Sequence, residues 1–127
     1  MDYSPHIWER FRRPRYAGTL AGADVVCGES RTPASKAVLR LQLKVAEGKI
    51  HVARFLALGC PSTIAAGDWL CEWLEGRTLP DTAALTAGSL AEALVLAPVR
   101  RHCAVLAEDA LRAALADLQS SERPECP

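Results

Sequence analysis

Apolar and polar residues alternate strictly along residues 39–45, which read Leu-Arg-Leu-Gln-Leu-Lys-Val. A period of two is typical of a β-strand with one buried face. Glu47 and Gly48 predict a turn, and residues 49–58 predict the returning strand of a hairpin. We expect a weaker strand over residues 23–29 and a polar loop at 30–35.

The apolar spacing at the N-terminus is helical instead. Ser4 is a suitable N-cap, Pro5 fits the first helical position, and the apolar stripe continues up to Pro14. A helix this short is unstable alone, so we expect its apolar side to dock on the rest of the chain.

The second half of the chain has helical spacing as well. Residues 62–75 predict a helix that ends at Gly76, and residues 89–92 (Ser-Leu-Ala-Glu) predict a capping box that opens a short helix. A long helix is expected after Pro98. On the first of these helices, Asp68 and Glu72 lie one turn apart, which favours a solvated face.

Strands first and helices afterwards indicate an α+β fold, in which helices pack on one face of a small antiparallel sheet. The 127 residues are 50% hydrophobic and 24% charged, which is typical of a globular domain. We expect one domain over residues 1–119 and a disordered tail over 120–127.

The charge pattern excludes some classes of partner. Fifteen Lys and Arg residues balance fifteen Asp and Glu residues, so no basic excess is present to neutralise nucleic-acid phosphates. No apolar run approaches the roughly 20 residues of a membrane-spanning helix, and no secretion signal is evident. We therefore expect a cytoplasmic protein that binds neither nucleic acid nor membranes.

The chain contains five cysteines, at positions Cys27, Cys60, Cys71, Cys103 and Cys126. Because their number is odd, their spacing irregular and an export signal lacking, thiolate chemistry or metal binding is a better interpretation than a disulfide framework. For each cysteine the alternative is a small buried apolar side chain.

Two of these cysteines fall at junctions of predicted elements. Cys60 lies between a strand and the next helix, and Cys103 follows His102 in the first turns of the last helix. Helix N-termini stabilise thiolates. The three side chains would supply two sulfurs and one nitrogen to a metal ion or cluster, provided that a fourth donor exists.

Several short motifs, taken together, resemble one known family. They are Tyr3-Ser4, Pro14-Arg15, Leu41 to Val45, Ala53-Arg54-Phe55, Gly59-Cys60, Glu72-Trp73, Gly76, Leu96 to Arg100, His102-Cys103 and Leu106 to Ala110. From about Tyr3 to Leu118 the chain resembles the IscU/NifU-type scaffold proteins of iron–sulfur cluster assembly. The resemblance implies the SufE/NifU (IscU-like) fold and a site for iron, zinc or a cluster at Cys60, His102 and Cys103.

The first cysteine motif departs from the family pattern. The family has Pro-Ala-Cys-Gly-Asp, whereas this chain has Pro33-Ala34-Ser35-Lys36-Ala37. Ser35 stands in place of the first ligand cysteine and Ala37 in place of the aspartate. A serine hydroxyl is a poor ligand for iron or zinc compared with a thiolate, so the three-cysteine site is incomplete.

Another cysteine would have to replace the missing ligand. Cys27 precedes Ser35 by eight residues and becomes a candidate if the loop is shifted, although a core-facing strand position is the simpler interpretation. Cys71 lies roughly 16 Å along the helix from Cys60 and is expected in the core. Cys126 falls in the expected tail.

The resemblance implies three possible functions, and we expect that the protein is not an enzyme. The first is a cluster scaffold whose missing ligand comes from Cys27, a small thiol or a second protomer of a homo-oligomer. The second is a persulfide acceptor that uses Cys103, for which we expect a depressed thiol pKa beside His102. The third is a paralogue that binds no metal and docks on the assembly machinery.

The resemblance also implies partners. They are a cysteine desulfurase and a DnaK-type chaperone with its J-protein. The family's chaperone-recognition segment, Leu-Pro-Pro-Val-Lys, corresponds here to Leu96, Ala97, Pro98, Val99 and Arg100. One proline and the cationic end of the segment are retained, which favours chaperone binding.

Overall fold

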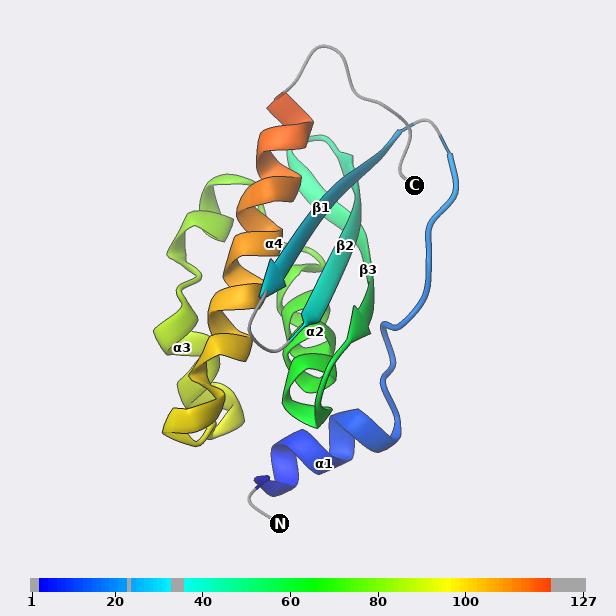
Figure 1. Cartoon of the computed structure of the whole chain (residues 1–127). Coiled ribbons are helices and arrows are strands. Elements are labelled where there is room, and N and C mark those ends of the chain that lie inside the picture. The colour runs from blue at the N-terminus through cyan, green and yellow to red at the C-terminus, as the bar shows by residue number, and fades with distance from the viewer. Residues whose placement is uncertain (1–2, 23, 33–35, 120–127) are drawn as a thin grey trace.

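The computed structural model describes residues 3–22, 24–32 and 36–119, and its strands form one antiparallel sheet in the order β1-β2-β3 (Figure 1). The strands are β1 (Val25–Thr32), β2 (Ala37–Ala46) and β3 (Lys49–Leu58). The predicted hairpin and the α+β class are therefore confirmed. The division into a domain and a tail stays a prediction, because residues 120–127 lie outside the described residues.

The expectation of a loop from residue 30 is wrong for residues 30–32. These residues continue β1, where Ser30 pairs with Leu39 and Thr32 with Ala37 of β2. Their polar side chains suggested a loop, but the Ser30 hydroxyl donates a hydrogen bond to the Leu106 carbonyl, and Arg31 is exposed. Residues 33–35 lie outside the described residues.

The helices are α1 (Pro5–Arg12), α2 (Pro61–Leu74), α3 (Ala87–Leu94) and α4 (Arg101–Gln119), with short 3-10 turns at Pro80–Ala84 and Pro98–Arg100. Ser4 caps α1 as predicted, since its Oγ accepts a hydrogen bond from the Ile7 amide. The capping box of α3 begins three residues earlier than predicted. Thr86 is its N-cap, and the Ser89 hydroxyl takes the role that a glutamate commonly fills.

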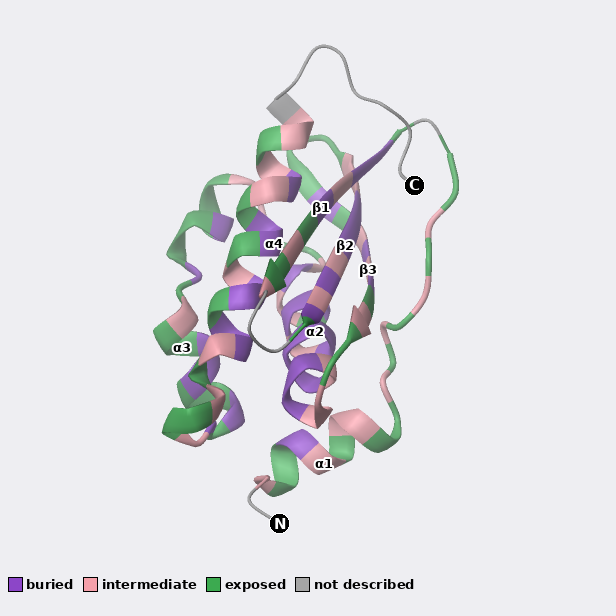
Figure 2. Ribbon diagram, viewed as in Figure 1, coloured by how far each residue is buried: buried purple, intermediate pink, exposed green. Residues whose placement is uncertain are grey.

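The core lies between the sheet and the helices that cover one of its faces (Figures 1 and 2). Leu39, Leu41 and Leu43 of β2 are fully buried on that face. Two glycines permit the close approach of helices to the sheet. A Cβ at Gly28 would collide with the backbone of α4 at Ala110 and Ala114, and a Cβ at Gly67 of α2 would collide with Phe55 and Leu39.

The N-terminal segment is fixed to α2 and β3. Arg10 of α1 forms an ion pair of 2.9 Å with Asp68, which is 1% exposed and also accepts a hydrogen bond from the Tyr16 amide. The Gly18 amide donates a hydrogen bond to the Phe55 carbonyl at the outer edge of β3. The expectation that Asp68 lies on a solvated face is wrong, because α1 and the following segment cover it.

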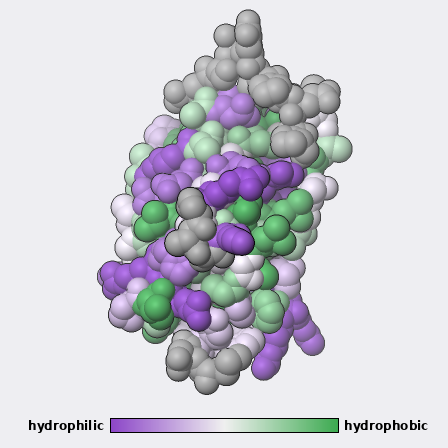
Figure 3. All heavy atoms as spheres, viewed as in Figure 1, coloured by the Kyte–Doolittle hydropathy of each residue, from purple (hydrophilic) through white to green (hydrophobic). Residues whose placement is uncertain are grey.

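The described surface is mixed in character. On the face shown in Figure 3, hydrophilic and hydrophobic side chains gather in small groups rather than in one continuous field. Within the described residues, none of the helices has the length and apolar character needed to cross a membrane.

Candidate functional site

Cys60 lies where the chain turns from β3 into α2. It is the N-cap residue of α2, and Pro61 follows at the first helical position. Gly59, before it, has φ +153°, and a Cβ there would fall 2.7 Å from Oγ1 of Thr63. Glycine therefore fits this turn on both counts, and the turn leaves the Cys60 thiol half-buried at the start of the helix.

Cys103 approaches Cys60 from α4. It is the third residue of that helix and is 0% exposed. The two sulfur atoms lie 3.9 Å apart. Two thiolates at about 2.3 Å from one tetrahedral metal ion lie about 3.8 Å from each other, so this separation suits a shared ion. The proximity predicted from the sequence is present.

Thr63 lies beside both sulfurs, and no sequence motif pointed to it. Its Oγ1 is 3.7 Å from Sγ of Cys60 and 3.4 Å from Sγ of Cys103, and the residue is 1% exposed. One turn of helix separates Thr63 from the cap residue Cys60. The sequence signal that could have identified Thr63 is its position three residues after Cys60, because residues three apart on a helix are neighbours.

The two thiols have shifted acidities. Burial raises the pKa of Cys60, but hydrogen bonds from the Thr63 amide and hydroxyl and from the Ser62 amide outweigh burial, so that its pKa is lowered. Burial raises the pKa of Cys103 to about 11, and the neighbouring Cys60 sulfur adds to the increase.

The expectation of a depressed thiol pKa at Cys103 is therefore wrong. The positive charge of Arg100 lowers the pKa of Cys103 by less than burial raises it. The sequence placed Cys103 near a helix start but did not show that this side of α4 faces the core. Cys60 is the thiol that a reagent can reach.

His102 is the third predicted donor. Its Nε2 atom lies 3.6 Å from Sγ of Cys103, a separation close to that of a sulfur and a nitrogen on one tetrahedral ion, about 3.6 Å. In the described part of the chain, however, no group of three or more His, Cys, Asp or Glu side chains is arranged to hold a metal ion. The cysteine pair is preformed, whereas a third ligand has to move or come from elsewhere.

The altered loop supplies no evident replacement within the described residues. Ala37 begins β2, is 2% exposed and has no donor atom. Lys36 beside it is exposed in the left-handed region, with φ +55°. Ser35 lies outside the described residues.

Cys27 lies far along the sheet from the cysteine pair. It pairs with Gln42, four residues along β2 from Val38, whose partner is Leu58 near the end of β3. Four residues of strand span roughly 13 Å. Cys27 is also disulfide-bonded, so in this state it has no thiol to offer.

Cys71 is not part of the pair. Cys71 is 0% exposed in α2 and burial raises its pKa, which agrees with the expected core position. Cys126 lies outside the described residues.

The predicted chaperone segment lies between α3 and α4. Leu96 is buried, while Pro98 is exposed and Val99 is 72% exposed. The Arg100 guanidinium lies 5.2 Å from the centre of the Tyr3 ring. The segment therefore presents Pro98 and Val99 to solvent and anchors Leu96 in the core.

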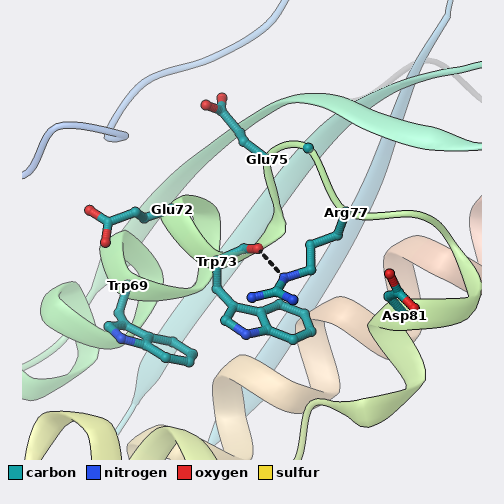
Figure 4. A pocket seen from close by; sticks show the side chains of 7 residues that line it. Trp69, Glu72, Trp73, Glu75, Arg77 and Asp81 are labelled. Atoms are coloured by element: carbon teal, nitrogen blue, oxygen red, sulfur yellow. Dashed lines mark hydrogen bonds between the residues drawn. The ribbon is translucent and has the colours of Figure 1, made fainter.

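A separate hollow of about 450 Å³ lies near the C-terminal end of α2 (Figure 4). The Trp69 and Trp73 rings stack 6.4 Å apart, and the Arg77 guanidinium lies 4.1 Å from the centre of the Trp73 ring. Trp69, the lining residue nearest to Cys60 in sequence, lies nine residues after it, which is roughly 14 Å along α2. The hollow is therefore not part of the cysteine site.

Comparison with known proteins identifies relatives along nearly the whole chain. Residues 2–124 match the model of the family described as "NifU-like N terminal domain". The chain is 41% identical over 123 residues to the iron–sulfur cluster assembly scaffold protein IscU of Escherichia coli K12, covering 94% of this chain and 96% of that protein. It is 39% identical over 124 residues to a Drosophila melanogaster protein named iron–sulfur cluster assembly enzyme IscU. This match covers 95% of this chain and 80% of that protein.

A solved structure shares the fold. The N-terminal NifU-like protein of Brucella abortus superposes with a TM-score of 0.76 at 16% identity, over 94% of this chain and 95% of that one. The chain is therefore similar to the IscU scaffold proteins, and the matched family model shows that it belongs to the NifU-like N-terminal domain family.

Proposed function

We propose that the protein is a scaffold-like component of iron–sulfur cluster assembly that holds iron, zinc or a cluster on Cys60 and Cys103, with His102 as a further ligand. The supporting observation is the 3.9 Å separation of the two sulfurs, which matches the edge of a tetrahedral ligand set. Thiolates are the ligands that iron–sulfur clusters use. In this role the protein carries a cargo and is not an enzyme.

The site is weaker than a three-cysteine site. Within the described residues the pair has only the imidazole of His102 as an additional neighbour of the ligand type, at 3.6 Å from Cys103. The remaining ligands would come from a small thiol, from a second protomer or from Cys27 after its disulfide is reduced. Of these, Cys27 is disfavoured by its distance along the sheet.

The partners that we propose follow from the family. A cysteine desulfurase would supply sulfur, and a DnaK-type chaperone with its J-protein would bind Leu96 to Arg100. The exposed Val99, in the turn Pro98–Arg100, supports this assignment, because it offers an apolar side chain to a groove on a partner. Val99→Asp should abolish capture of the chaperone without loss of fold, and unchanged capture would exclude the segment.

The scaffold function is tested by the composition of protein purified without oxygen. We expect iron or zinc, with or without acid-labile sulfide, in amounts that fall in Cys60→Ser and Cys103→Ser. Cys71→Ser is the matched control, since Cys71 is a free buried cysteine outside the pair. Metal content that is negligible in all proteins after anaerobic loading with Fe²⁺ and sulfide would contradict the proposal.

A second candidate function is sulfur acceptance. Cys60 is half-buried at a helix start and its pKa is lowered, which suits a thiol that takes a persulfide sulfur from a donor. Cys103 cannot be the acceptor in this conformation, because it is 0% exposed. The test is a mass increase of about 32 Da on Cys60 after treatment with a persulfide donor.

A further inference from the structure

The two thiols of the pair differ in access. Cys60 is half-buried at the turn before α2, whereas Cys103 is 0% exposed beneath it. A sulfur donor that approaches from solvent therefore reaches Cys60 and not Cys103. Among the described residues, a persulfide formed on Cys60 would have the Cys103 sulfur as its nearest thiol, starting from 3.9 Å.

This arrangement allows a second step. Reacting atoms in a productive complex lie about 3–3.5 Å apart, so a small side-chain rotation brings Sγ of Cys103 within reach of Sγ of Cys60. The hydroxyl of Thr63, 3.4 Å from the Cys103 sulfur, holds that sulfur beside its neighbour.

We propose that Cys103 is a resolving thiol, which discharges a persulfide on Cys60 as hydrogen sulfide and leaves a Cys60–Cys103 disulfide. The inference rests on the sulfur-acceptance function of Cys60. In this reaction the Cys103 sulfur bonds to Sγ of Cys60, the Cys60 S–S bond breaks, and the outer sulfur leaves with the thiol proton as H₂S. The two thiols lose two electrons in total, and the sulfane sulfur gains them.

The consequence is that the chain itself supplies the electrons that reduce sulfur to sulfide. A low-molecular-weight dithiol or a dithiol protein must then reduce the disulfide before another cycle. During the disulfide state neither sulfur is available to a metal ion, so sulfide release and metal binding alternate at one pair of atoms.

The experiment uses the full chain, metal-free and reduced, with glutathione persulfide as the sulfur donor. After rapid removal of the donor and of glutathione, H₂S release and protein mass are followed over time. Trypsin places Cys60 in the peptide 55–77 and Cys103 in the peptide 102–112. The disulfide therefore appears as a single linked pair of these two peptides.

In the unmodified chain we expect a transient mass increase of about 32 Da on the peptide 55–77, followed by the linked peptide pair and one H₂S per chain. In Cys103→Ala the increase should persist, with H₂S release at least about tenfold slower. Cys71→Ala is the matched control, because Cys71 shares the peptide of Cys60. It should behave as the unmodified chain does.

Two results would overturn the inference and are distinguishable. If the persulfide on Cys60 forms but decays equally fast in Cys103→Ala, or if the added sulfur moves to the peptide 102–112, Cys103 is not a resolving thiol and sulfur acceptance stands. If no persulfide forms on Cys60 in any variant, sulfur acceptance fails as well. Circular dichroism of each variant establishes that the fold is retained.

Discussion

Thr63 and Cys103 meet inside the protein, with the threonine hydroxyl 3.4 Å from the cysteine sulfur. The same hydroxyl lies 3.7 Å from Sγ of Cys60. One buried hydroxyl thus contacts both thiols, and it contributes to the lowered pKa of Cys60. This relationship leads to the first prediction.

Thr63→Val should slow the alkylation of Cys60 near neutral pH by several-fold, because the variant keeps the side-chain shape but removes a hydrogen bond to the thiolate. Limiting iodoacetamide and peptide mass spectrometry measure the rate. Thr82→Val is the control, since Thr82 is also buried but bonds to the Leu79 carbonyl, away from the pair. A Cys60 rate that is equal in both variants would show that the hydroxyl has no such role.

The two thiols should also differ in their pH profiles. Cys60, with its lowered pKa, should be alkylated at a lower pH than an ordinary thiol, whereas Cys103, with a pKa of about 11 and no exposure, should react last of the two. The profiles are measured in metal-free protein between pH 6 and about pH 10. Labelling of Cys103 before Cys60 would contradict the assigned environments.

Because the pKa of Cys103 is raised, we expect the stability of the folded protein to depend on pH. The folded protein keeps this thiol neutral to about pH 11, while an unfolded chain ionises it near its ordinary value of about 8.5. The contribution of the Cys103 thiol to the free energy of unfolding is therefore complete below about pH 8.5 and is lost as the pH rises towards 11. In urea unfolding, Cys103→Ala should show a shallower loss of stability between pH 8 and 10 than the unmodified chain. Parallel slopes would contradict the assignment.

The buried carboxylate of Asp68 should matter more than surface ion pairs. Asp68→Asn weakens the bonds to Arg10 and to the Tyr16 amide, and we expect a loss of about 2–4 kcal/mol in the free energy of unfolding. Arg31→Ala breaks the exposed pair with Glu29 and should cost less than about 1 kcal/mol. Equal losses in urea titrations would show that α1 is not held by Asp68.

The close contact of β1 with α4 gives another prediction. Gly28→Ala should cost about 3 kcal/mol or more, because the added methyl group collides with the α4 backbone. Gly48→Ala is the comparison at an open turn with φ +74°, where only backbone strain of about 1 kcal/mol is expected. Thermal unfolding of both variants should separate them clearly, and similar melting temperatures would contradict this packing.

Much of this fold was predictable from local pattern. The hairpin follows from strict alternation around Leu41, and the helix after Cys60 follows from the helical spacing of residues 62–75. The strand at Ser30 was missed, because an edge strand is held by pairing with β2, and pairing has no local signal. The capping box was placed wrongly, because Ser89 serves as its third helical residue and not as the cap.

The site was predictable in part. The family motifs predicted that Cys60 and Cys103 lie in one site. The acidity of each thiol, however, depends on its burial, which only the packing of the chain determines. Asp68 appeared solvated in sequence because its partner Arg10 is distant along the chain. The role of Thr63 depends on the packing of α4 against α2, which brings Cys103 to the threonine hydroxyl.

The central claim is that Cys60 and Cys103 bind one metal ion together, and anaerobic titration with Co²⁺ tests it most directly. Thiolate ligands produce an intense near-ultraviolet charge-transfer absorption whose strength follows the number of sulfurs on the ion. We predict a saturable band that falls to roughly half in Cys60→Ser and in Cys103→Ser, disappears in the double variant and is unchanged in Cys71→Ser. A band that is missing from the unmodified chain, or one that is unaffected by either substitution, would contradict the shared site.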